Sequence, residues 1–162
     1  MSAIAAEYLR IEDELVALFK RLHAELRPGT ASLRVRRSEE HGAQVTIFPK
    51  NPRAASVWAH AETGLPLIDF GFGEYEPTWE LPLEGANPEA SKDELLLEVE
   101  NLCHSVIAGH CENRRFLLGV GSVVRVGSRD YKVRHFPILW PKTPFRGTRK
   151  YQAYNSETTD AI

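Results

Sequence analysis

Residues 57–72, VWAHAETGLPLIDFGF, contain two apolar-alternating runs on either side of a turn, and this stretch decides the fold. Apolar and polar residues alternate over 57–61, which is the period of a strand with one buried face. A second strand-like run covers 66–72, and residues 62–65 supply a four-residue loop rich in turn formers. The stretch therefore predicts an antiparallel β-hairpin.

The register of this hairpin can be written out from the alternation. With the four-residue loop, Ala59 faces Ile68 on an apolar face. Trp58 then lies across from Asp69 on the other face, with His60 on the diagonal. Because no charge falls on the apolar face, we expect one side of the hairpin to be buried and the other to stay polar.

The period of two continues on both sides of the hairpin, over residues 32–81 as a whole. Turn residues interrupt it at several points, which predicts an antiparallel meander of four or five short strands. The last run contains Pro77, which lacks a ladder donor, so it is expected to be an edge strand or a loop. The expected strands lie at residues 32–36, 43–47, 55–61, 66–72 and 75–81.

Two amphipathic helices flank the meander. Residues 1–26 carry one apolar stripe at steps of three and four, and Pro28-Gly29 ends the pattern. This helix is expected to pack on the sheet, the alternative being that it pairs with its copy in a dimer. The second helix begins at Ser91, which forms a capping-box spacing with Glu94, and ends at Gly109.

A second hairpin is expected after this helix, with strands over 116–126 and 130–136. The fold class is therefore α+β: a single mostly antiparallel sheet of six to seven strands with two packed helices. Its order is α-β-β-β-β-(β)-α-β-β, followed by an extended C-terminal arm rich in proline, basic and aromatic residues. Residues 1–154 are expected to form one domain, and 155–162 a disordered tail.

Charge is segregated along the chain. Residues 62–100 carry eleven acidic residues and one base, Lys92, whereas residues 114–150 carry ten bases and one acid, Asp130. The formal net charge of −2 conceals these acidic and basic blocks. Potentials of this size are neutralised against each other within the fold or against a partner. Macromolecular binding is therefore the first expectation, rather than small-molecule chemistry.

Several function classes lack their sequence signals. No apolar run approaches the roughly 18 residues of a membrane span, and residues 1–20 lack a signal-peptide pattern, so a cytoplasmic protein is expected. No phosphate-binding loop, nucleophile elbow or zinc-protease motif occurs. The residues Cys103, His104, His110 and Cys111 form adjacent pairs that do not converge as zinc ligands do. We therefore expect no metal and no cofactor, and two reduced thiols rather than a disulfide.

Two alternative functions remain open. His60 and Asp69, with Trp58 as an aromatic wall, could form the acid–base pair of a small enzyme. Alternatively, the basic aromatic block could neutralise phosphates and stack on bases of a nucleic acid. The candidate nucleic-acid-binding residues are Arg134, Trp140, Arg146, Arg149, Lys150 and Tyr151. Against this alternative, the same bases could instead brace the acidic block inside the fold.

The leading hypothesis is a non-enzymatic protein-binding module with an acidic aromatic surface that binds a basic partner. Acidic groups speed such association, and aromatic side chains anchor it. The candidate residues are Asp69, Glu74, Tyr75, Glu76, Trp79 and Glu80. In size, charge layout and expected architecture the chain is similar to small bacterial immunity proteins, which bind and inhibit toxins, although no motif carries this likeness. A monomer or a homodimer is expected.

Overall fold

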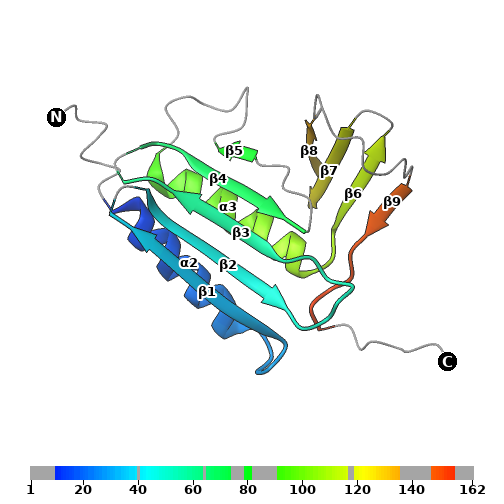
Figure 1. Ribbon diagram of the computed structural model, residues 1–162, viewed down its shortest axis with the longest axis horizontal. Coiled ribbons are helices and arrows are strands. Elements are labelled where there is room, and N and C mark those ends of the chain that lie inside the picture. Colours follow the sequence, from blue (N-terminus) through cyan, green and yellow to red (C-terminus); the bar gives the residue numbers. More distant parts are fainter. Residues whose placement is uncertain are drawn as a thin grey trace.

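The computed structural model describes residues 10–39, 41–63, 65–73, 79–81, 91–116, 119–135 and 147–155 (Figure 1). For residues 115, 116, 119, 120 and 133–135 it describes the backbone only. The helices are α2 (Ile11–Glu25) and α3 (Lys92–Ile107). The strands are β1 (Ala31–Ser38), β2 (Gly42–Pro49), β3 (Val57–Ala61), β4 (Ile68–Phe72), β5 (Trp79–Leu81), β6 (Cys111–Phe116), β7 (Gly119–Val126), β8 (Arg129–His135) and β9 (Gly147–Lys150).

Strands β1 to β5 form an antiparallel sheet in sequence order, with both helices behind one face (Figure 1). This large sheet confirms the expected meander. Its inner face is apolar because every second residue of each strand points at the helices, as in Val45, Ala59 and Phe70, all fully buried. The strand after Pro77 is indeed at the edge, as β5. Neither described helix is long and apolar enough to span a membrane.

The β3–β4 hairpin differs from the predicted register by two residues. Ala61 pairs with Ile68 and Ala59 with Phe70, so the connection is six residues long rather than four. The expected four-residue loop is wrong because Pro66 cannot donate a ladder hydrogen bond, and the strand begins after it. A slip of two keeps every side chain on its predicted face. One consequence is that His60 lies directly opposite Asp69.

The expectation of a single sheet is wrong. Strands β6 to β9 form a separate four-stranded antiparallel sheet in the order β8-β7-β6-β9. The strand predicted over 116–126 corresponds to β7, whereas β6, which precedes it, was not predicted. The sequence of β6, CENRRF, has no apolar alternation, because its buried face carries Asn113 beside Cys111. The hairpin of β7 and β8 is present as expected, but its turn is Gly127-Ser128 rather than residues 127–129, because Val126 pairs with Arg129.

The helix boundaries agree with the sequence at α3 and differ at α2. The Ser91 hydroxyl accepts from the Glu94 N–H while the Glu94 carboxylate accepts from the Ser91 N–H, so the capping box is confirmed. Gly109, with φ 78°, follows the end of α3. The described part of the first helix begins at Ile11, because Arg10 has φ 79° and cannot continue a helix. Residues 1–9 of the predicted helix lie outside the described residues.

The C-terminal segment, residues 147–155, connects the two sheets. Its first four residues form β9, which pairs with β6. Beyond β9, the main-chain N–H of Gln152 donates to the Arg53 carbonyl at 2.9 Å, and that of Tyr154 donates to the Ile107 carbonyl at 3.0 Å. This segment is therefore part of the fold rather than an extended arm. The rest of the predicted arm, residues 137–146, and residues 156–162 of the expected tail lie outside the described residues.

Candidate functional site

The outer face of the large sheet, on the side away from the helices, carries a continuous row of polar side chains. The register pairs Arg36 with Gln44, Gln44 with His60, His60 with Asp69, and Asp69 with Glu80. Directly paired residues lie on the same face, so these five form one line across all five strands, which we call the polar row. It runs from a base on β1 to two acids on β4 and β5.

A second line, next to the polar row, centres on an aromatic side chain. Arg34 pairs with Thr46, Thr46 with Trp58, and Trp58 with Gly71. A β-carbon at Gly71 would lie 2.5 Å from the indole ring, so the half-buried Trp58 lies flat on that glycine. The guanidinium of Arg34 stacks on the ring of Phe48, 4.8 Å from its centroid. The outer face thus offers a fixed aromatic platform beside charged groups.

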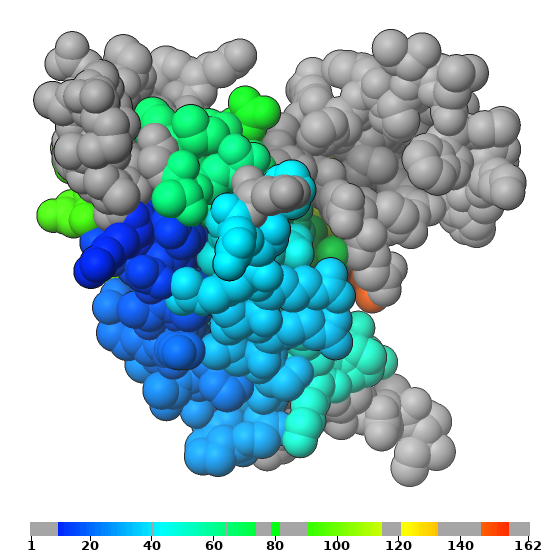
Figure 2. Space-filling model, turned by 60° about the vertical axis from the view of Figure 1, so that its left-hand side comes forward, coloured from blue at the N-terminus to red at the C-terminus, as the bar shows by residue number. Residues whose placement is uncertain are grey.

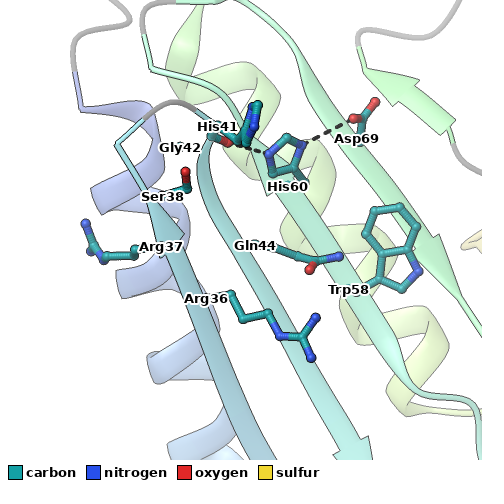
Figure 3. Close-up of a pocket in the computed structure, with 9 residues that line it drawn as sticks. All are labelled: Arg36, Arg37, Ser38, His41, Gly42, Gln44, Trp58, His60 and Asp69. Atoms are coloured by element: carbon teal, nitrogen blue, oxygen red, sulfur yellow. Dashed lines mark hydrogen bonds and ion pairs between the residues drawn. The ribbon is translucent and has the colours of Figure 1, made fainter.

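An open groove of about 390 Å³ crosses this face (Figure 3). Its lining comes from β1, β2, β3, β4 and the β1–β2 turn, which brings together segments far apart in sequence. The lining residues are Arg36, Arg37, Ser38, His41, Gly42, Gln44, Trp58, His60 and Asp69. Figure 2 shows β1 and β2 reaching the surface beside α2 at this side of the molecule. A groove so open suits side chains of a partner better than a small substrate that must be enclosed.

Both ring nitrogens of His60 face partners within the fold (Figure 3). Nε2 lies 2.6 Å from the main-chain oxygen of His41, and Nδ1 lies 3.4 Å from a carboxylate oxygen of Asp69. A carbonyl only accepts, so Nε2 is the donor in its contact with His41. These contacts link β3 to β4 and to the β1–β2 turn.

The predicted partner-binding residues fall into three groups. Asp69 and Glu80 are paired neighbours on the outer face. Trp79 points the other way: it is 2% exposed and stacks on Phe72 with ring centroids 5.4 Å apart. Trp79 is therefore a core residue and cannot anchor a partner, because its position opposite Phe70 puts it on the inner face. Glu74, Tyr75 and Glu76 lie outside the described residues.

Among the predicted nucleic-acid-binding residues, Tyr151 is buried. It is 5% exposed, its hydroxyl accepts from the Asn113 amide at 2.9 Å, and its ring meets Phe72 edge to face. A ring held in this way cannot stack on a base, so the prediction that Tyr151 stacks on a nucleic-acid base is wrong. The guanidinium of Arg149 lies over the same ring, 5.3 Å from its centroid.

The remaining predicted nucleic-acid-binding residues are scattered or not described. Lys150 is exposed at the end of β9. Arg134 takes the position opposite Gly121 in β8, where the backbone alone is described. Trp140 and Arg146 lie outside the described residues. The structure therefore does not bring these residues together as one described surface.

The cysteines are two free thiols in the core. Cys103 and Cys111 are 0% and 5% exposed. Burial raises the pKa of the Cys111 thiol to about 12 and holds that of Cys103 well above its usual range. Within the described part of the chain, no cluster of three or more metal-ligating side chains occurs.

Sequence reasoning missed three residues of the site, namely Arg34, Arg36 and Gln44. They occupy the polar positions of the alternating strands β1 and β2, and that alternation is the only sequence signal they give. The strand order that lines them up with His60 and Asp69 is not visible from alternation.

Comparison with known proteins gives no match: no family model, no curated protein and no solved structure is significantly similar to this chain. No function can therefore be transferred from a relative.

Proposed function

We propose that this protein is a non-enzymatic protein-binding module whose contact surface is the outer face of the large sheet. One observation carries the proposal: the polar row crosses all five strands, uncovered by either helix, with Trp58 beside it. A sheet face that is merely solvated needs no central tryptophan. Tryptophan and arginine are the side chains that most often dominate protein–protein affinity.

The chemistry of this face favours a macromolecule with its own rigid surface. Trp58 already lies against Gly71, so little rotamer freedom is lost when a partner covers the indole. His60 is held at both ring nitrogens, which fixes the middle of the polar row. A contact surface fixed before binding lowers the entropic cost of association.

The charges at the two ends of the outer face indicate which groups a partner would carry. Asp69 and Glu80 would meet basic groups, as in an inhibitor-type protein that covers the basic site of an enzyme such as a nuclease. Arg34 and Arg36, at the other end, would meet acidic groups. Such opposite ends allow one docking orientation and penalise the reverse, which puts like charges together.

The test begins with affinity capture from the native cell, followed by identification of the captured proteins and kinetics with the purified partner. We expect Trp58→Ala to weaken binding by about 2 kcal/mol or more, roughly thirty-fold in Kd. Glu80→Lys should act mainly on the association rate, with a larger effect at low salt. Glu25→Lys is the matched control, because Glu25 is an exposed acid at the end of α2, behind the sheet.

The outcomes separate the proposal from its alternatives. A partner that binds the wild type and the Glu25→Lys variant alike, and the two outer-face variants weakly, supports the proposal. A partner that binds all four proteins equally well contradicts it. A chemical activity of the isolated protein that His60→Ala abolishes would favour the enzyme alternative.

A further inference from the structure

The small sheet has an outer face of its own, and this face is basic. The register pairs Lys132 with Val123, Val123 with Glu112, and Glu112 with Lys150. These four residues therefore form one line across β8, β7, β6 and β9. The two lysines stand on the two edge strands, three strand spacings or about 14 Å apart.

Two arginines stand on the same face beside that line. Arg114 is two residues from Glu112 along β6, and Arg125 is two residues from Val123 along β7, so both share the face. Their side chains are 54% and 66% exposed, and that of Lys132 is 64% exposed. A groove of about 350 Å³ runs between Arg114, Arg125 and Lys150, with Glu112 and Val123 among its lining.

The carboxylates on this face neutralise only part of the positive charge. Glu112 accepts from Arg114 Nε at 2.7 Å. Asp130 accepts from Arg125 Nε at 3.0 Å and lies 3.8 Å from the Lys132 ammonium. Four bases against two acids leave an excess of two positive charges on the described residues of the face.

We propose that this basic face, with the groove in it, is a second binding site, which takes the phosphodiester backbone of a nucleic acid. The roughly 14 Å between Lys132 and Lys150 covers about three consecutive phosphates of one strand. No phenylalanine or tryptophan lines the groove, its Tyr151 is buried and held by Asn113, and His110 is the one exposed ring of the lining, so stacking contributes little. Recognition therefore falls on phosphates and is independent of base sequence.

This site is separate from the protein-binding face. It lies on the other sheet and shares no residue with the polar row, so either proposal can fail without the other. Of the nucleic-acid-binding residues that the sequence suggested, Lys150 is the one that belongs to this site. Binding here depends on a line of cations rather than on aromatic stacking.

The test uses a labelled single-stranded oligonucleotide of mixed sequence, with binding followed by fluorescence anisotropy between 50 and 200 mM salt. Three phosphate contacts predict a slope of log Kobs against log salt of about −2, or roughly fifteen-fold weaker binding across this range. Lys132→Gln/Lys150→Gln should weaken binding at least about ten-fold at 50 mM salt and flatten the slope by about 1.4. Lys20→Gln/Arg27→Gln removes the same charge from α2 and the turn after it and should change binding less than about two-fold.

Melting curves of both double variants check that each is folded; these substituted side chains are exposed or half-buried at the surface. No oligonucleotide binding at 50 mM salt would overturn the proposal. Equal losses in the two double variants would overturn it as well, because net charge alone would then explain binding. Binding to anionic phospholipid vesicles that excess oligonucleotide fails to displace would point to a membrane surface and would also overturn it.

Discussion

Cys103 and Cys111 are buried thiols held in the protonated form, which predicts low reactivity. The thiolate is the reactive species, so we expect a thiol reagent at pH 8 to label the protein only as fast as it unfolds. Their folded pKa values lie above the unfolded value. The stability that this burial contributes is therefore present below pH 9 and is lost as the pH rises toward 12.

Denaturant unfolding at pH 8, 10 and 11 measures this loss. The Cys111→Ala variant is the control, since its stability should fall less steeply over the same interval. Rapid stoichiometric labelling of the native protein at pH 8 would contradict the buried positions.

Asn113 is a buried polar side chain in a closed network. Its amide donates to Tyr151 at 2.9 Å, and its amide oxygen accepts from the Ser122 hydroxyl at 2.6 Å. Asn113→Ala would leave both hydroxyls without this partner in the core, which costs about 1–3 kcal/mol. Chemical unfolding measures the change. The exposed Asn101 on α3 supplies the matched control, and an equal effect of Asn101→Ala would count against the network.

At the scale of elements, the C-terminal segment holds the two sheets together. Tyr154 is 3% exposed, and its hydroxyl donates to the Ala55 carbonyl at 2.7 Å. Ending the chain after Arg146 removes β9 and both buried tyrosines. We expect a loss of at least about 3–5 kcal/mol in the free energy of unfolding, comparable with removing one large buried ring.

A chain that ends after Asn155 is the matched control for this truncation. It keeps every described contact of the C-terminal segment, so its melting temperature should stay close to that of the full chain. A shorter chain that melts at the same temperature as the full one would show that the segment does not stabilise the fold.

The elements that the sequence predicted well are those with an unbroken apolar period. Strands β1 to β4 follow an alternation of two, and α3 has both its cap and its terminator in the sequence. β6 was missed because Glu112 and Arg114 surround a buried asparagine, which looks like a loop. The polar row was only partly predictable, since His60 and Asp69 came from one hairpin while Arg36 depends on strand order.

At the scale of the molecule, the acidic and basic blocks occupy different structures. The described acidic residues of the acidic block lie in the β3–β4 connection, β4, β5 and α3, and the described bases of the basic block lie in the small sheet. Glu100 pairs with Arg21 of α2 at 2.7 Å, whereas Arg125 pairs within the small sheet. Among ion pairs between two described residues, none joins the blocks. Burial raises the pKa of Glu98 of the acidic block, and the charge of Arg129 of the basic block acts against that rise, so the two blocks interact there.

We infer that a protein partner covers the outer face of the large sheet, and Trp58 would report on this contact directly. Oxidative footprinting with mass spectrometry can compare the free protein with its purified complex. We expect oxidation of Trp58 to fall several-fold in the complex, while the core residue Trp79 stays protected in both states. Equal oxidation of Trp58 in the free and bound protein would contradict the claim.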